Sequence, residues 1–212
     1  MNYQEANKWD YENGYFLTCD TERVGKLLMQ WELFKTIPKG DIIEVGVFKG
    51  ASLMRLAMYR NLIDGHQYRS VYGFDMFGHF PTDEIESAND KAFIDNFVAN
   101  AGEPPSKDEV RRYIDAKGMQ GVHLIEGNIY NTLFPFVQHK PEIALLNIDV
   151  DAYEPTKYAL ITLMPFVVSR GVVMLDDYAH CEGAKRACDE VLGAENIIQG
   201  KLYKAPHFFI KD

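Results

Sequence analysis

The sequence predicts an α/β protein with a mostly parallel β-sheet and helices on both of its faces. Segments with strand-like and helix-like spacing of apolar residues alternate along the chain, which is typical of repeated strand-helix-strand units. The strand-like segments are short apolar runs, as expected for strands buried on both faces. The 212 residues are 47% hydrophobic and 25% charged, which is sufficient for one substantial core. We therefore expect residues 1–212 to form a single domain.

Seven segments are expected to be strands. Five apolar runs form the body of the sheet and cover residues 41–46, 70–75, 121–126, 142–149 and 171–176. Two shorter segments near the end of the chain, residues 196–199 and 207–210, are separated by Gly200. The first five strands are expected to be parallel because helix-like segments alternate with them.

Helices are expected between and before these strands. Apolar residues at three- and four-residue spacing predict helices over residues 50–64 and 154–168, and Pro155 suits the first turn of the second helix. A third helix, over residues 21–37, precedes the first strand. Residues 1–40 are therefore expected to form a helical extension of the sheet domain.

Residues 81–121 interrupt the alternation of strands and helices. They are mostly polar and contain two helix-like pieces, residues 88–101 and 106–117. Long excursions over the carboxyl edge of a sheet commonly cover a binding site, so we expect an inserted helical lid. A structural elaboration and an oligomer contact are the alternatives.

Charge and cysteine content narrow the class of partner. A formal net charge of -9 disfavours binding to nucleic acid or to an anionic membrane, because like charges repel. The three cysteines are too unevenly spaced for a disulfide framework or a metal knuckle. No signal peptide is recognised, and no apolar stretch reaches the roughly 20 residues that span a bilayer. We expect a cytoplasmic protein with a small-molecule partner.

Carboxylates gather at the ends of two expected strands. Asp149 ends one strand, and Asp176 and Asp177 end the next. The carboxyl ends of neighbouring parallel strands meet at one edge of a sheet, so these side chains are expected to converge, with Asp151 as a fourth carboxylate. Such an all-oxygen cluster suits Mg²⁺ or Ca²⁺ rather than zinc. Separate helix capping by each aspartate is the alternative, and nearby His180 is a candidate proton acceptor.

A turn that contains glycines follows the first expected strand. It includes Glu44, Gly46, Gly50 and Ser52. Its spacing departs from the dinucleotide-binding G-x-G-x-x-G pattern, so it suits a nucleoside without phosphates better than a pyrophosphate. The alternative is a tight turn that needs glycine for packing alone.

Two further strand ends offer polar side chains at the same edge of the sheet. Asp75 ends the second strand, where an acidic side chain can accept hydrogen bonds from ribose hydroxyls. Gly127 and Asn128 follow the third strand, where an amide can contact an adenine or a ribose. Capping of the following segment is the alternative for both Asp75 and Asn128.

Four of these segments together carry a resemblance to a known family. They are IIEVGVFKG at residues 42–50, VYGFD at 71–75, IDVDAYEPT at 148–156 and GVVMLDDY at 171–178. The set resembles class I methyltransferases that use S-adenosylmethionine, and more narrowly the macrocin O-methyltransferase family of sugar-modifying enzymes. The resemblance implies a Rossmann-like, seven-stranded sheet whose last strand is antiparallel. It also implies Mg²⁺ held by Asp149, Asp176 and Asp177.

The resemblance also implies a reaction and a cofactor site. The chain is expected to methylate a hydroxyl of a sugar or of a glycosylated small molecule, as a homo-oligomer. Asp149 is the first candidate for the base that accepts the hydroxyl proton, and His180 is the second. Residues expected to contact S-adenosylmethionine are Glu44, Gly46, Gly50, Ser52, Asp75, Gly127, Asn128 and Asp149. The alternatives are a catechol-like aromatic diol as acceptor, a metal-dependent hydroxylase-like enzyme, and a non-catalytic module with a nucleoside pocket.

Overall fold

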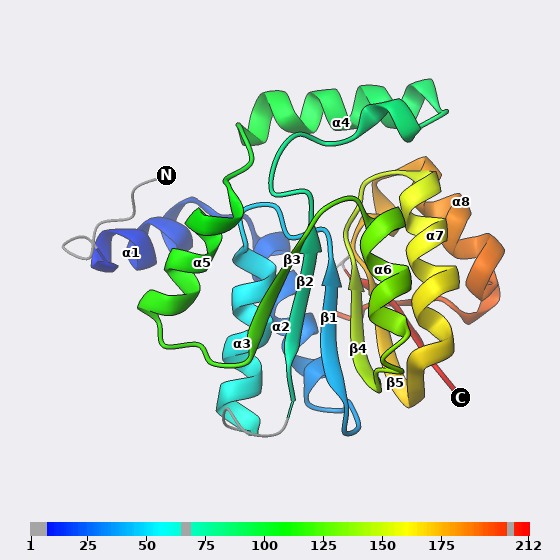
Figure 1. Cartoon of the computed structure of the whole chain (residues 1–212). Helices are drawn as coiled ribbons and strands as arrows, with labels where there is room; N and C mark the ends of the chain where they lie inside the picture. The colour runs from blue at the N-terminus through cyan, green and yellow to red at the C-terminus, as the bar shows by residue number, and fades with distance from the viewer. Residues whose placement is uncertain (1–7, 65–68, 203–205) are drawn as a thin grey trace.

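The computed structural model describes residues 8–64, 69–202 and 206–212, which contain a seven-stranded sheet (Figure 1). The strands are β1 (Asp41–Val45), β2 (Val71–Asp75), β3 (Val122–Glu126), β4 (Ile143–Ile148), β5 (Val167–Leu175), β6 (Ile198–Gln199) and β7 (His207–Ile210). Their order across the sheet is β3-β2-β1-β4-β5-β7-β6. The strands from β3 to β5 pair in parallel, and β7 is antiparallel to both of its neighbours. The predicted fold class, with its antiparallel last strand, is confirmed.

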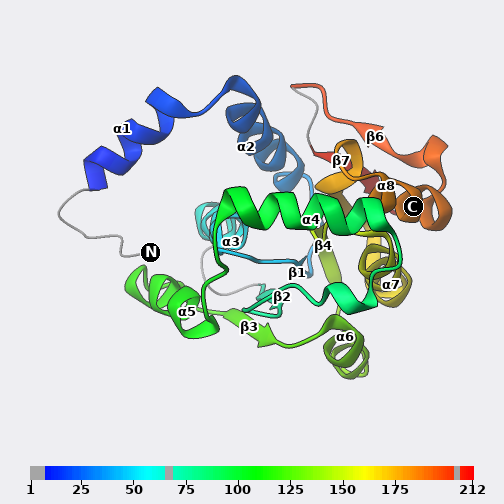
Figure 2. The ribbon, with the colours of Figure 1, turned by 90° about the horizontal axis from the view of Figure 1, so that it is seen from above.

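Helices cover both faces of the sheet (Figure 1, Figure 2). One face carries α2 (Thr21–Phe34), α3 (Ala51–Ile63) and α5 (Lys107–Ala116), and the other carries α6 (Ile129–Val137), α7 (Tyr153–Leu163) and α8 (Glu182–Leu192). Each face is sealed by its own apolar cluster, which includes Phe34, Leu56 and Ile114 on the first side and Leu133 and Leu160 on the second. No helix in the described part of the chain is long and apolar enough to cross a membrane.

Local sequence explains where several of these elements begin. Asp20 caps α2 by accepting a hydrogen bond from the Arg23 amide at 2.9 Å. Ser106 and Glu109 form a capping box at the start of α5. All six residues of β4 are buried, which accounts for the mostly apolar sequence of this central parallel strand; Asn147 is its one polar residue.

Two expected helix ends are wrong. The helix expected over residues 154–168 ends at Leu163, and β5 begins at Val167 rather than at residue 171. Pro165 lies between them in a short 3-10 helix, and it has no amide hydrogen with which to continue the α-helix. The helix expected over residues 21–37 ends at Phe34, because Pro38 has no amide hydrogen to donate to the Phe34 carbonyl oxygen.

The segment between β2 and β3 divides into parts with different locations. Helix α4 (Ala88–Ala101) crosses above the carboxyl edge of the sheet (Figure 2). Helix α5 instead packs against the sheet, with Val110 and Ile114 in the apolar cluster that also contains α3. The part of the expected lid that overlies the strand ends is therefore α4. Helix α1 (Lys8–Thr18) precedes α2 and lies away from the sheet (Figure 2).

The amino edge of the sheet is tied together by Arg60, near the end of α3. The Arg60 side chain is fully buried, and it donates hydrogen bonds to the carbonyl oxygens of Arg69, Gln120 and Gly121 at 3.2, 2.6 and 3.2 Å. Arg69 lies just before β2, and the other two residues lie just before β3. One guanidinium thus joins α3 to the starts of two strands.

Candidate functional site

A cavity of about 830 Å³ lies at the carboxyl edge of the sheet, on the side covered by α4. Its volume is that of a typical small-molecule site. The expected site residues that line it are Gly46, Ser52, Asp75, Gly127, Asn128, Asp149, Asp176, Asp177 and His180. Glu44 and Gly50 do not belong to its lining among the described residues. The strand ends therefore bring most of the expected site into one cavity.

Gly46 fixes the turn at the end of β1. Its φ angle is 92°, which favours glycine, and an added Cβ would lie 1.7 Å from the carbonyl oxygen of Asp149. The backbone after β1 therefore presses directly on the backbone after β4. Gly50, by contrast, is buried at the start of α3, where an added Cβ would meet Val110.

Asp75 organises the same turn. Its Oδ2 accepts hydrogen bonds from the amides of Val47 and Phe48 at 2.7 and 2.8 Å, and its Oδ1 accepts one from Phe77 at 2.7 Å. The capping role considered for Asp75 is therefore present. The ribose contact stays a prediction, which its place in the cavity lining supports.

Asn128 caps α6. Its side-chain oxygen accepts a hydrogen bond from the Tyr130 amide at 3.0 Å, and its side-chain nitrogen donates to both carboxyl oxygens of Glu84 at 2.9 Å. The capping alternative considered for Asn128 is therefore present. Contact with an adenine or a ribose stays a prediction.

Glu44 lies in the protein interior behind the glycine turn. The residue is fully buried, and the Asn147 side chain donates a hydrogen bond to its carboxyl at 2.8 Å. Burial raises the pKa of Glu44 to about 7, even though hydrogen bonds from Ser52 and Asn147 favour the charged form. One oxygen of Glu44 and the side-chain oxygen of Asn147 have no hydrogen-bond partner in the described part of the chain. Glu44 thus combines an interior position with a strong tendency to hold a proton.

Three carboxylates meet at the ends of β4 and β5. Oxygen atoms of Asp149, Asp151 and Asp177 all lie within 4.8 Å of one another. Asp177 also accepts a hydrogen bond from the backbone amide of Asp151 at 3.0 Å. Asp151 has a φ angle of 57°, a conformation that non-glycine residues rarely adopt. The loop after β4 is therefore held in an unusual shape that turns Asp151 toward its neighbours.

Burial and mutual repulsion make these carboxyl groups reluctant to ionise together. Burial, followed by the charges of Asp176 and Asp177, raises the pKa of Asp149 well above its usual range. Burial and then the charge of Asp149 raise the pKa of Asp151 to about 7. Burial and then the charges of Asp151 and Asp176 raise the pKa of Asp177 well above its usual range. A divalent cation would offset this repulsion, and the oxygen-only donor set matches Mg²⁺.

Asp176 lies beside this cluster and pairs with Lys26 of α2. Lys26 Nζ is 2.6 Å from Asp176 Oδ2, whereas Asp176 Oδ1 is buried with no hydrogen-bond partner among the described residues. Burial lowers the pKa of Lys26, but the charges of Asp176 and Asp149 outweigh this effect, and the pKa is raised overall. The partnerless oxygen is a second observation that fits a cation at this position.

Sequence reasoning missed Lys26, although a signal was present. Lys26 is spaced three, four and seven residues before the buried residues Met29, Gln30 and Leu33, so it lies on the buried side of α2. A lysine in that phase needs an acidic partner. The partner itself could not be read from the helix.

The two base candidates differ in their surroundings. Asp149 lies inside the cluster, whereas His180 is exposed at the edge of the cavity. Asp151, which sequence reasoning treats only as a fourth carboxylate, lines the same cavity with a pKa near 7. The structure therefore adds Asp151 as a third candidate base.

The chain is similar in sequence to known O-methyltransferases. The sequence profile of Macrocin-O-methyltransferase (TylF) matches residues 26–204. A demethyldecarbamoylnovobiocin O-methyltransferase from Streptomyces niveus is 31% identical over 156 residues, which are 71% of this chain and 57% of that protein. The chain thus spans less than two thirds of the length of this curated relative.

Two solved structures have a similar fold. The O-methyltransferase NovP has a TM-score of 0.74 and 25% identity, over 89% of this chain and 80% of that chain. CalS11, a calicheamicin methyltransferase, has a TM-score of 0.68 and 22% identity, over 98% of this chain and 86% of that chain.

Proposed function

Because the chain belongs to the macrocin O-methyltransferase (TylF) family, we propose that it transfers the methyl group of S-adenosylmethionine to a hydroxyl of a sugar or glycosylated small molecule, with the help of Mg²⁺. The observation that carries the proposal is the carboxylate cluster, which shares one cavity with the glycine turn after β1. The relative from Streptomyces niveus is named for O-methylation of demethyldecarbamoylnovobiocin, which supports a small-molecule acceptor.

The cofactor is proposed to lie over the ends of β1 and β2. S-adenosylmethionine supplies a methyl group on a positively charged sulfur. Gly46 lets the backbone come close to the ligand, and Ser52 lines the same part of the cavity. Asp75 binds three backbone amides but retains acceptor capacity for a ribose hydroxyl, because an ionised carboxylate offers about four acceptor positions.

Asp149, Asp176 and Asp177 are proposed to hold the cation. A cation held there would favour the deprotonated form of an acceptor hydroxyl. The partnerless Oδ1 of Asp176 supports its inclusion, since Lys26 occupies only the other oxygen.

Asp151 is proposed as the base that accepts the hydroxyl proton. Its carboxyl lines the cavity and lies outside the proposed set of cation ligands, so it can accept a proton. Asp149 is a weaker base if it binds a cation, and His180 is exposed at the edge of the cavity. We therefore place Asp151 ahead of Asp149 and His180.

The proposed function is tested by methyl transfer from labelled S-adenosylmethionine to a panel of acceptors. The panel contains nucleotide-linked sugars, glycosylated natural products and catechols, so that it also separates a sugar from an aromatic diol. Asp176→Asn should abolish both turnover and Mn²⁺ binding while S-adenosylhomocysteine still binds. Asp151→Asn should abolish turnover but keep Mn²⁺ binding. Full transfer in excess chelator would contradict the metal requirement.

Other expectations from the sequence belong to the same proposal. The segment 81–121 is proposed to cover bound ligands through α4, whose residues Phe93, Phe97 and Val98 line the cavity. A cytoplasmic location and a homo-oligomeric assembly remain predictions. The absence of nucleic acid and membrane partners, based on the net charge of -9, also remains a prediction.

A further inference from the structure

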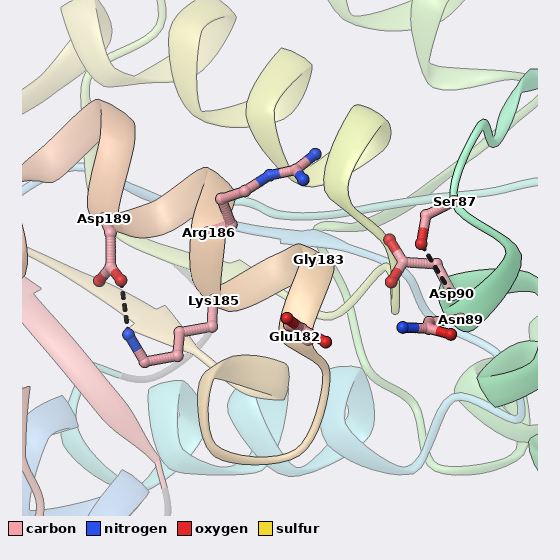
Figure 3. A pocket seen from close by; sticks show the side chains of 8 residues that line it. All are labelled: Ser87, Asn89, Asp90, Glu182, Gly183, Lys185, Arg186 and Asp189. Atoms are coloured by element: carbon pink, nitrogen blue, oxygen red, sulfur yellow. Dashed lines mark hydrogen bonds and ion pairs between the residues drawn. The ribbon is translucent and has the colours of Figure 1, made fainter.

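Asp90 connects α4, which lies over the carboxyl edge of the sheet, to the starts of two other helices. The residue is 2% exposed, and its Oδ2 accepts a hydrogen bond from the amide of Tyr153, the first residue of α7, at 3.0 Å. Figure 3 shows the same carboxyl group directed at Gly183 in the first turn of α8, beside a second cavity of about 370 Å³. A single carboxylate therefore lies at two helix amino termini.

Neither of these helices has a capping side chain of its own. The residues at their N-cap positions, Ala152 for α7 and Cys181 for α8, make no side-chain capping hydrogen bond. A helix amino terminus favours a nearby negative charge, so Asp90 supplies α7 with a hydrogen-bond acceptor and α8 with a nearby carboxylate.

Gly183 leaves the space that Asp90 occupies. An added Cβ on Gly183 would lie 1.8 Å from Asp90 Oδ2 and 2.6 Å from Oδ1. Any other residue at position 183 would therefore push the carboxyl group away. Ser87 holds the backbone of Asp90, because its hydroxyl accepts a hydrogen bond from the Asp90 amide at 3.2 Å (Figure 3).

Both helix starts directly follow loops that carry the acidic cluster. The loop with Asp149 and Asp151 leads into α7, and the loop with Asp177 leads into α8. The thiol of Cys181 donates to the carbonyl oxygen of Asp151 at 3.0 Å, so the two loops also contact each other. Ile94, one turn after Asp90 on α4, packs against Ala152 in a small buried cluster. Movement of Asp90 would thus be transmitted to the cluster carboxylates.

The far end of α4 is anchored at the glycine turn. Lys49 Nζ donates a hydrogen bond to the carbonyl oxygen of Ala101, the last residue of α4. The rings of Phe48 and Phe97 meet edge to face with centroids 5.1 Å apart. Helix α4 therefore spans the cavity from the proposed cofactor side to the acidic side.

We propose that Asp90 is a positioning residue. It holds the loop with Asp149 and Asp151 and the loop with Asp177 in fixed positions relative to each other and to α4. This inference rests on the proposed function, because the loops matter only if their carboxylates bind a cation. Asp90 itself does not contact the cation or the acceptor. It acts through the backbone of Tyr153 and the first turn of α8.

The test compares four single variants and one double variant of the full chain. Asp90→Ala removes the contact, Asp90→Asn keeps an acceptor oxygen without the charge, and Gly183→Ala displaces the carboxyl group. Asp95→Ala is the matched control, because Asp95 is an exposed aspartate on the same helix. Mn²⁺ affinity is measured by electron paramagnetic resonance, S-adenosylhomocysteine affinity by calorimetry, and loop protection by hydrogen exchange.

Asp90→Ala and Gly183→Ala should each weaken Mn²⁺ binding by about 10-fold or more, whereas S-adenosylhomocysteine binding should change by less than about 2-fold. Asp90→Asn should recover part of the lost Mn²⁺ affinity, and Asp95→Ala should bind Mn²⁺ as the wild type does. The double variant Asp90→Ala with Gly183→Ala should bind Mn²⁺ no more weakly than Asp90→Ala alone, because both changes remove the same contact. A purely structural role would lower both affinities together, and this result would overturn the proposal.

Hydrogen exchange keeps the two proposals separate. Amides of residues 150–156 and 181–186 should exchange faster in Asp90→Ala, while those of α3 should not change. If the wild-type protein binds no Mn²⁺, the proposed metal chemistry fails, and the exchange rates alone then decide whether Asp90 holds the loops. Unchanged exchange in both loops would overturn the inference about Asp90.

Discussion

Gly46 and Asp149 are packed backbone against backbone, so that no side chain can exist at position 46 without displacing the carbonyl group of Asp149. Gly46 belongs to the turn proposed to hold the cofactor, and Asp149 belongs to the loop proposed to hold the cation. The two functions therefore share one tight contact between the ends of β1 and β4. A substitution at either residue should therefore change the affinity for both the cofactor and the cation.

Gly46→Ala is expected to impair both binding activities. The added Cβ would overlap the Asp149 carbonyl and would also be strained at the positive φ angle of Gly46. We expect at least about a 10-fold loss in affinity for both S-adenosylhomocysteine and Mn²⁺, as measured by calorimetry. Gly14→Ala is the control, because an added Cβ there meets nothing within 4 Å. Loss of only one affinity would argue against a shared contact.

Lys26→Met is expected to have opposite effects on stability and on cation binding. Without Lys26, Asp176 loses its partner at 2.6 Å, and the chelator-treated protein should lose on the order of 1–3 kcal/mol in free energy of unfolding. Mn²⁺ should bind more tightly, because a competing positive charge is gone. Chemical denaturation and Mn²⁺ titration measure the two effects. Lys185→Met, which removes an exposed pair with Asp189, should change neither quantity much.

Asp75→Ala is expected to weaken both the cofactor site and the fold. Loss of a ribose contact should reduce S-adenosylhomocysteine affinity by on the order of 1–3 kcal/mol. Loss of the acceptor for Val47, Phe48 and Phe77 should also lower the melting temperature. Asp83→Ala, at an exposed aspartate nearby, provides the control. An unchanged dissociation constant would refute the ribose assignment.

Glu44 is expected to make stability depend on pH. Its pKa is raised from 4.5 to about 7 in the folded protein, so the folded state binds this proton more tightly than the unfolded chain. The resulting stabilisation is complete below pH 4.5 and is lost as the pH rises through 7. Glu44→Gln imitates the protonated form, so its advantage in free energy of unfolding over wild type should grow between pH 5 and pH 8.5. Equal advantages at both pH values would contradict a buried titrating carboxyl.

The strand framework could be predicted because buried parallel strands leave a direct trace in the sequence. Strands β1 and β4 are mostly apolar, with a polar residue inside each, and turn residues bound them closely. The boundary between α7 and β5 was missed because Pro165 lies inside a run of apolar residues that suits either structure. Composition alone does not say whether such a proline ends a helix or lies in its first turn.

The site could be predicted only as far as topology determines it. Parallel strands bring their carboxyl ends together, which is why Asp149 and Asp177 were expected to meet. Which oxygens lie closest depends on the shape of each loop, and the structure groups Asp151 with them while Lys26 binds Asp176. The role of Asp90 depends on contacts between helices far apart in the chain. Its only trace in the sequence is an acidic residue one turn before the buried Ile94.

The hydrogen bonds of Arg60 make the amino edge of the sheet more rigid than its carboxyl edge. Three carbonyl oxygens hold the guanidinium at the amino edge, so the starts of β2 and β3 cannot separate without stranding a buried charge. At the opposite edge, burial and then the charges of neighbouring carboxylates raise the pKa values of Asp149 and Asp177, so their charged forms are disfavoured there. Local opening of the structure should therefore begin at the carboxyl edge of the sheet, while the amino edge stays closed.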